Sequence, residues 1–226
     1  MEHRPGRKRG IWAIVLLILG VALNAGAIAL MLSLFKPVIY AGDAMLPTLP
    51  HGERVLLKRD PPEVHRGDIV EYDPADWQMQ GPFIGRVVAV GGDHIAYAKG
   101  DDTLTLNGKP LDEPYVLGGA PGAPGFSFAV SVPQGRVFVL GDNRGNAADS
   151  RYGLEAQQGT LPMSGVTGVR VPEENALMLA LGLTSTVGTL ALPVGIGLGI
   201  SALVARRKRQ PVPAGPVWGA VHVDES

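Results

Sequence analysis

The feature that most constrains this chain is an uninterrupted apolar segment near its N-terminus. Residues 10–35 contain no charged side chain, and a basic cluster at residues 4–9 directly precedes them. As an α-helix, a segment of this length extends about 39 Å, which exceeds the roughly 30 Å hydrocarbon core of a membrane. A cleaved secretory signal peptide is the alternative, but its apolar core is usually only about 7–15 residues long. We therefore predict an uncleaved transmembrane helix over residues 11–35.

A second charge-free run covers residues 175–205 and ends at the basic residues 206–209. It contains five glycines and Pro193, which membrane helices tolerate better than soluble helices do. The run is too short for two crossings of about 20 residues each, so it fits one tilted or Pro193-kinked span. A buried helix of a soluble domain is the alternative, and the length and the basic end argue against it.

The distribution of charge predicts the orientation of both spans. Basic residues lie at the outer end of each apolar run, and such residues favour the cytoplasmic side of a membrane. We expect a plasma-membrane protein with a cytoplasmic N-terminus (residues 1–10), a cytoplasmic tail (residues 206–226) and an extracytoplasmic domain (residues 36–174). That domain has 12 Lys and Arg against 18 Asp and Glu, a net charge of −6, and the chain has no cysteine. Nucleic acid is therefore not an expected partner, and no disulfide is available.

Short apolar segments between the two spans are typical of β-strands. The segments at 54–59, 67–72, 83–90, 103–106 and 135–141 are rich in Val, Ile, Leu and Phe, and Gly, Pro and Asp separate them. Asn107-Gly108 is a strong signal for a two-residue hairpin turn, whereas residues 118–125 are expected to form a loop. The segment is thus expected to be mainly β, an antiparallel barrel or sandwich flanked by two transmembrane helices. The sequence has no metal-ligand cluster or phosphate-binding loop, and we expect no cofactor and no metal.

Four motifs follow one another in this region. They are GDAMLPTL (42–49), RGDIVEY (66–72), GRVVAVGGD (85–93) and GDNRGNAADSR (141–151). In this order, behind an N-terminal anchor, they resemble the type I signal peptidases, bacterial serine-lysine endopeptidases that remove signal peptides from exported preproteins. The resemblance covers most of residues 11–174. It implies a Ser nucleophile in the first motif, a Lys general base before the Arg of the third motif, and a second Ser in the fourth motif that orients the Lys amine.

All three of these functional positions depart from the family pattern. The nucleophile position is Ala44, the general-base position is Gly85, and the Lys-orienting position is Ala147. Asp43, beside the missing nucleophile, is an isolated carboxylate and is interpreted as a turn residue. In a well-studied serine protease, removal of the nucleophile alone lowers turnover by a factor on the order of 10⁶. By this comparison the catalytic set of the chain is not intact.

Residues that shape the family's fold are present in the same motifs. Those of the loop that the resemblance assigns to the substrate groove are Gly42, Asp43, Met45, Pro47 and Thr48. Those of the structural motifs are Arg86, Asp142, Asn143, Arg144, Asp149, Ser150 and Arg151. We interpret the charged members as a structural ion-pair network.

Three functions are compatible with this pattern. The first, which we favour, is an inactive signal-peptidase homologue that binds signal peptides or preproteins, or assists an active paralogue or a surface-assembly machinery, at the lipid membrane. The second is an active signal peptidase in which the nucleophile Ser has been replaced at Ala44, but this explains Gly85 and Ala147 poorly. The third is a structural membrane module without a peptide groove.

Overall fold

The computed structural model describes residues 7–61, 63–119, 121–122, 127–172 and 175–207. The chain forms two compact units, one made from its two ends and one from Met31–Asn175. The predicted terminal segments 1–10 and 206–226 lie mostly outside the described residues, as does part of the predicted loop 118–125. The two units are described separately below.

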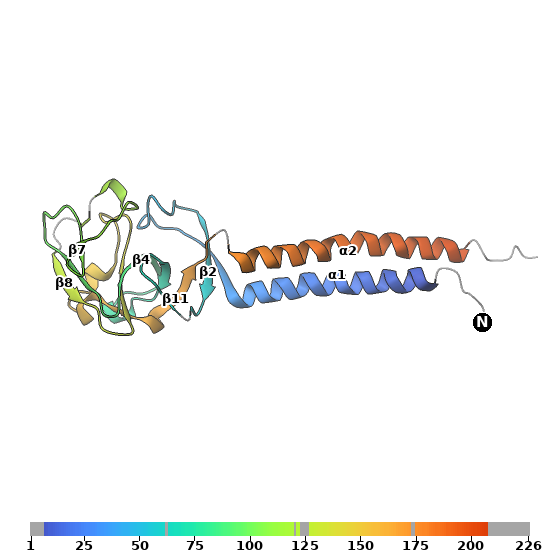
Figure 1. The fold of residues 1–226 in the computed structure, drawn as a ribbon, viewed down its shortest axis with the longest axis horizontal. Coiled ribbons are helices and arrows are strands. Elements are labelled where there is room, and N and C mark those ends of the chain that lie inside the picture. Colours follow the sequence, from blue (N-terminus) through green and yellow to red (C-terminus); the bar gives the residue numbers. More distant parts are fainter. Residues whose placement is uncertain (1–6, 62, 120, 123–126, 173–174, 208–226) are drawn as a thin grey trace, which may run out of the picture. The chain divides into compact units, whose positions relative to one another are not determined.

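The first unit is a pair of long apolar helices, α1 (Arg7–Leu34) and α2 (Ala176–Arg207) (Figure 1). Both are long and apolar enough to cross a membrane, and α2 continues through Pro193. Most of their large apolar side chains are exposed, as expected for helices whose surroundings are lipid rather than protein. The helices include Arg7, Lys8 and Arg9 at one end of α1 and Arg206 and Arg207 at the end of α2.

Small residues at seven-residue intervals allow the two helices to pack closely. The buried positions are Ala13, Gly20 and Ala27 in α1 and Gly188, Gly195 and Ala202 in α2. A methyl group built on Gly20 would lie 2.8 Å from the Gly188 carbonyl oxygen, so this position requires glycine for close approach. Asn24 of α1 accepts hydrogen bonds from Ser185 (2.8 Å) and Thr189 (3.3 Å). Gly10 lies near Ala202 and Gly20 near Gly188, so the helices are antiparallel.

The second unit contains two antiparallel sheets. The larger has the order β1-β2-β11-β3-β4-β9-β10 and the smaller the order β7-β6-β5-β8. The strands are β1 (Phe35–Ile39), β2 (Arg54–Arg59), β3 (Ile69–Tyr72), β4 (Phe83–Val90), β5 (His94–Tyr97), β6 (Thr105–Leu106), β7 (Lys109–Pro110), β8 (Phe128–Ser131), β9 (Arg136–Leu140), β10 (Leu161–Pro162) and β11 (Val166–Arg170). Short 3₁₀ helices lie at η1 (Ala75–Trp77), η2 (Leu117–Gly119), η3 (Ser150–Gly153), η4 (Gln157–Gly159) and η5 (Met163–Gly165).

The larger sheet is strongly curled. Lys36 of β1 contacts Glu71 of β3 at 2.8 Å although β2 and β11 lie between these strands in the sheet. Register shifts in the β4–β9 and β11–β3 pairs add local twist. The expected fold class, a mainly β antiparallel domain with two apolar helices, is confirmed.

Individual strand predictions were accurate where the apolar pattern is local. The segments 54–59 and 83–90 form β2 and β4 with the predicted bounds, and Asn107-Gly108 connects β6 to β7. Both turn residues have positive φ, 53° and 75°, as a type I′ turn requires. The pattern does not predict β1, β5, β8, β10 or β11. These strands are two to five residues long, and their stability comes from pairing with other strands.

Candidate active site

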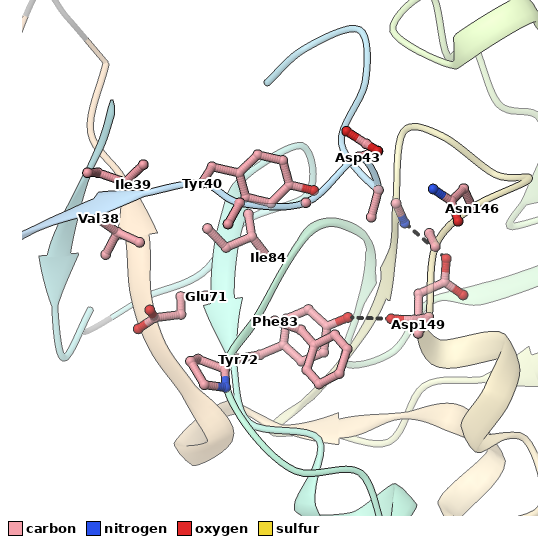
Figure 2. A pocket seen from close by; sticks show the side chains of 17 residues that line it. Val38, Ile39, Tyr40, Asp43, Glu71, Tyr72, Phe83, Ile84, Asn146 and Asp149 are labelled. Carbon is pink, nitrogen blue, oxygen red and sulfur yellow. Dashed lines mark hydrogen bonds between the residues drawn. The ribbon is translucent and has the colours of Figure 1, made fainter. Parts of the chain in front are cut away.

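A cavity of about 480 Å³ opens between the end of β1, the first residues of β4 and the loops around residues 141 and 146–149 (Figure 2). Its walls are mainly apolar, with a few polar groups, which is typical of ligand sites. The residues that line it are Val38, Ile39, Tyr40, Ala41, Gly42, Asp43, Ala44, Glu71, Tyr72, Pro82, Phe83, Ile84, Gly141, Asn146, Ala147, Ala148 and Asp149.

Two of the three positions that match the family's functional residues line this cavity. Ala44 and Ala147 come from segments about one hundred residues apart, and Gly141 lies between them. A methyl group on Gly141 would overlap the Ala147 side chain and lie 2.6 Å from the Ala44 carbonyl oxygen. The same carbonyl accepts a hydrogen bond from the Asn143 amide at 2.9 Å. These contacts hold the loop of the first motif (residues 42–49) directly against the fourth motif. This loop, which matches the family's Ser-bearing loop, is called the nucleophile loop below.

The third position, Gly85, is buried in β4, and neighbouring side chains fill the space beside it. It is paired with Val70 of β3 and does not itself line the cavity. A methyl group on Gly85 would lie 2.6 Å from Val139 Cγ1 and 3.2 Å from Tyr72 Cε1. The Tyr72 hydroxyl extends along the cavity floor and donates a hydrogen bond to the Ala148 carbonyl at 3.3 Å. The packing therefore leaves no room for a longer side chain at position 85 unless Val139 or Tyr72 moves.

A tyrosine also occupies the underside of the nucleophile loop. The buried Tyr40 hydroxyl accepts a hydrogen bond from the Met45 amide at 3.0 Å. Burial raises the pKa of Tyr40, while backbone hydrogen bonds from Met45 and Ala44 act in the opposite direction. The Tyr40 hydroxyl is thus held against the backbone beside Ala44.

Other residues of this loop have structural contacts. Met45 is fully buried, and Pro47 follows a cis peptide bond. Asp43 is about half exposed, and its Oδ1 lies 4.0 Å from Nδ1 of the exposed His51. Its backbone carbonyl accepts a hydrogen bond from the Asn143 side chain at 3.1 Å. Gly42 packs against the Tyr40 ring.

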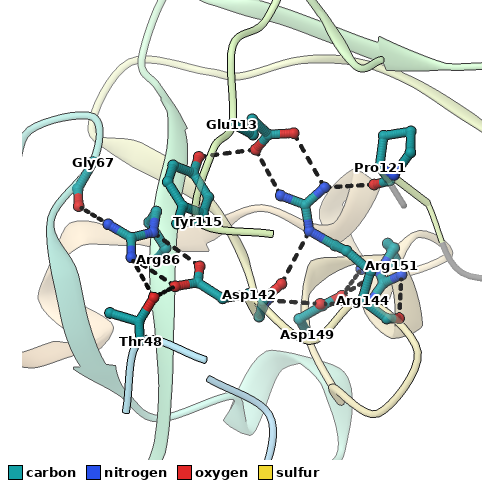
Figure 3. A network of polar contacts seen from close by, with 11 residues as sticks. Thr48, Gly67, Arg86, Glu113, Tyr115, Pro121, Asp142, Arg144, Asp149 and Arg151 are labelled. Atoms are coloured by element: carbon teal, nitrogen blue, oxygen red, sulfur yellow. Dashed lines mark hydrogen bonds and ion pairs between the residues drawn. The ribbon is translucent and has the colours of Figure 1, made fainter. Parts of the chain in front are cut away.

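Arg86 connects the third motif to the other three motifs (Figure 3). Its guanidinium donates to both Asp142 oxygens, at 2.9 and 2.6 Å, and to the Gly67 carbonyl at 2.9 Å. Asp142 is fully buried and also accepts a hydrogen bond from Thr48 of the nucleophile loop. Burial lowers the pKa of Arg86, but the hydrogen bond and the charge of Asp142 outweigh it, so the net shift is upward. The Arg86–Asp142 pair thus connects all four motifs.

Arg144 holds the segment after β9, which carries Asp142, against the loop after β7. It donates to both oxygens of Glu113, at 3.2 and 2.6 Å, to the Gly141 carbonyl and to the Pro121 carbonyl. Glu113 also accepts from the Tyr115 hydroxyl, and the Tyr115 ring stacks under Arg86 at 3.9 Å. Burial, followed by the Glu113 charge, raises the pKa of Tyr115. Glu113 and Tyr115 are also part of this network, although both lie outside the four sequence motifs.

Asp149, Ser150 and Arg151 fix the segment that follows Ala147. Both Asp149 oxygens accept from Arg151 at 2.8 Å, and Asp149 also accepts from the Gly141 amide at 3.0 Å. The Ser150 hydroxyl is fully buried and accepts a hydrogen bond from the Val139 amide at 2.9 Å. All three residues therefore have structural partners, and Asp149 additionally lines the cavity.

The sequence interpretation missed four residues at this site: Tyr40, Tyr72, Glu71 and Lys36. Tyr72 and Glu71 end the second motif, RGDIVEY. Successive side chains of a strand point to opposite faces, so the sequence does not indicate that both residues line the cavity. Lys36 follows the first apolar run and donates to both Glu71 oxygens at 2.8 Å. Among the residues that the structure describes, no group of three or more His, Cys, Asp or Glu is placed to hold a metal ion.

The β unit is antiparallel, and three of its four sequence motifs contribute residues to one cavity. Together with two long apolar helices, it defines a membrane-anchored protein of the β class. A family model described as signal peptidase, peptidase S26, matches residues 10–172. The probable signal peptidase I-1 of Synechocystis is 38% identical over 146 residues, which cover 58% of this chain and 70% of that relative. Signal peptidase I of Bacillus licheniformis is 37% identical over 131 residues, covering 54% and 68% respectively. The chain belongs to the signal peptidase family, peptidase S26.

Among solved structures, a signal peptidase I from Enterococcus faecalis is 28% identical, with a TM-score of 0.38. The match covers 47% of this chain and 96% of that one.

Proposed function

We propose that this family member binds signal peptides of exported preproteins in the cavity beside Ala44 but does not hydrolyse them. The observation that carries the proposal is that Ala44, Gly85 and Ala147 all lack a reactive side chain. The positions that match the family's nucleophile and orienting Ser bear methyl groups, and the position that matches its Lys bears no side chain. The packing of Val139 and Tyr72 beside Gly85 supports a site that has adapted to the absence of the Lys.

Other groups in the cavity do not replace the missing chemistry. Burial raises the pKa of both Tyr40 and Tyr72, so at neutral pH both are protonated hydroxyls. Asp149 is bonded to Arg151, and Glu71 is bonded to Lys36 and Thr167. A nucleophile needs a base within hydrogen-bond reach, and no such pair occurs among the described residues that line the cavity.

Restoration of the three side chains tests the proposal, and the structure adds one requirement. Because Gly85→Lys would collide with Val139, the full variant is Ala44→Ser, Gly85→Lys, Ala147→Ser and Val139→Ala together. We expect no cleavage of a preprotein by the parent chain or by Ala44→Ser alone, and measurable cleavage by the fourfold variant. The variant without Gly85→Lys is the matched control.

Two results would contradict the proposal in different ways. Cleavage at the signal-peptide junction by the parent, persisting after Asp43→Ala, would show that the enzyme is active. Recovery by Ala44→Ser alone would identify an active peptidase disarmed at a single position. A photoreactive residue placed at position 44 tests binding separately, since labelling of a signal peptide there is expected and its absence would favour a module without a groove.

We further propose that both termini lie in the cytoplasm and that the β unit lies outside it. The antiparallel arrangement of α1 and α2, with Arg9 near Ser201 and Gly10 near Arg206, supports placing both basic ends at one membrane face. The chain has no cysteine, so an impermeant thiol reagent can report topology on intact cells. Thr103→Cys is expected to react, and Ser226→Cys only after lysis; the opposite pattern would reverse the orientation.

A further inference from the structure

Glu71 is a buried carboxylate in the otherwise apolar wall of the cavity. It is 2% exposed, and the side chains near it in the lining include Val38, Ile39 and Ile84 (Figure 2). A carboxylate in such surroundings is costly unless it is paired and hydrogen-bonded, so its presence needs a compensating contact. We propose that Glu71 makes the cavity select peptides with an uncharged hydrogen-bond-donating side chain, Ser, Thr, Asn or Gln, at the position that meets this wall. The proposal rests on the function proposed above, that the cavity binds signal peptides.

The contacts of Glu71 leave part of its acceptor capacity open. Lys36 Nζ donates to Oε1 and Oε2, each at 2.8 Å, and the Thr167 hydroxyl donates to Oε2 at 2.7 Å. A carboxylate offers about four lone-pair positions, so Oε1, with one partner among the described residues, retains one position toward them. Glu71 lines the cavity with 3% of its side chain exposed, so a ligand there meets the carboxylate only through this small exposed part.

The charge of the pair decides which donor fits. Lys36, whose side chain is 38% exposed, already neutralises the Glu71 carboxylate. A Lys or Arg side chain in the ligand would bring a second cation close to Lys36, and the two would repel each other. An aliphatic side chain would leave Oε1 with a desolvated and unused position. An uncharged hydroxyl or amide donor avoids both penalties.

The location of Glu71 separates this effect from the chemistry at Ala44. In Figure 2, Glu71 lies near Val38 and Ile39, whereas Asp43, Asn146 and Asp149 lie at the opposite end of the cavity. An extended peptide advances about 3.3 Å per residue and points alternate side chains to the same side. One peptide residue therefore meets Glu71 while a different one lies against Ala44, and the preference is expected at a single position of the peptide.

A positional scan that compares the isosteric pair Val and Thr with the cationic Lys tests the inference. Fluorescent signal peptides carry Val, Thr or Lys at each of the five positions before the cleavage junction in turn, and their affinity for the full-length protein in detergent is measured by anisotropy. We expect one position at which Thr binds about fivefold more tightly than Val, the effect of one hydrogen bond, and at which Lys binds no better than Val. In Lys36→Met/Glu71→Leu, which replaces the pair with apolar side chains of similar size, Val is expected to bind better than Thr there.

Lys36→Met alone examines the role of the charge. With the ammonium gone and the carboxylate kept, the Lys peptide is expected to become the tightest binder at the same position. Equal affinities for Thr and Val at all five positions, or a Thr preference that survives in the double variant, would overturn the inference. A preference for Lys in the parent protein would overturn it as well. Failure of every peptide to bind the parent would instead refute the proposed function, which keeps the two outcomes distinct.

Discussion

Two consecutive residues of β4 show how differently the two sides of this site are built. Arg86 points into a polar network, in which Asp142, Thr48 and the Gly67 carbonyl accept hydrogen bonds from its three guanidinium nitrogens. Gly85 faces a packed apolar layer, in which Val139 and Tyr72 occupy the space of a side chain. The sites lie one residue apart on the same strand, yet one is rich in charge and the other contains none.

The difference follows from what each side chain does for the fold. Arg86 and Arg144 connect segments distant in the sequence, whereas Arg151 holds together the loop that contains Asp149. Removal of any of these arginines would leave a buried carboxylate without its partner. A buried Lys at position 85 would have required desolvation without a comparable gain in stability. The fold thus needs the network whether or not catalysis takes place, whereas position 85 needs only to be small.

The largest effect is expected from breaking the network at Asp149→Ala. The substitution leaves Arg151 buried without its carboxylate and removes the acceptor of the Gly141 amide. Loss of one partner of a buried pair costs about 3–5 kcal/mol, so we expect a loss of that size in the free energy of unfolding, measured by Trp fluorescence in denaturant. Asp76→Ala is the control, since Asp76 pairs with Arg136 at 3.1 Å but is partly exposed, and its loss should cost below about 1 kcal/mol. Equal effects of the two variants would show that the network is not special.

The apolar side of the comparison is examined by Gly85→Ala. The added methyl group would lie 2.6 Å from Val139 Cγ1, and overpacking of this kind costs about 1–3 kcal/mol. Gly145→Ala is the matched control, because its methyl group would meet only Asn143 Oδ1 at 3.8 Å. Val139→Ala combined with Gly85→Ala should destabilise the protein by less than the sum of the single variants. Strict additivity in the double variant would indicate that Val139 does not fill the space beside Gly85.

Much of the architecture was accessible from the sequence because its signals are local. The apolar runs that form α1 and α2 exceed the length of ordinary core helices, and β2 and β4 follow directly from short apolar segments. The order of the larger sheet was not accessible, since β11 pairs between β2 and β3 across about one hundred residues. Such pairing depends on the curl of the sheet, which no single segment encodes.

The site shows the same division. The resemblance to the signal peptidases singles out positions 44, 85 and 147, and the structure brings Ala44 and Ala147 to one cavity. That Gly85 would be packed against Val139, and that Tyr40 would engage the nucleophile loop, depends on side-chain packing between separate strands. Glu71 was hidden because its partner, Lys36, lies outside the motifs.

The smallest effect concerns Tyr72. Its ring packs beside Gly85, and its hydroxyl donates a hydrogen bond to the carbonyl of Ala148, the residue before Asp149. Burial, with a smaller contribution from the Asp149 charge, raises the pKa of Tyr72 above its ordinary value of 10.0. Above about pH 10 the unfolded chain releases this proton while the folded protein retains it, so the free energy of unfolding falls by about 1.4 kcal/mol per pH unit for this group. Below pH 10 both states are protonated, and this contribution does not vary with pH.

Tyr72→Phe removes that titration. At neutral pH the variant loses one hydrogen bond of 3.3 Å, and we expect a decrease of at most about 1 kcal/mol in the free energy of unfolding. Between pH 10 and 11 its stability should fall less steeply than that of the parent, though not remain constant, because the pKa values of Tyr40 and Tyr115 are also raised. Denaturant unfolding at pH 8, 10 and 11 measures both quantities. Parallel pH profiles for parent and variant would mean that the Tyr72 hydroxyl is in contact with water, and that the space beside Gly85 is open rather than filled.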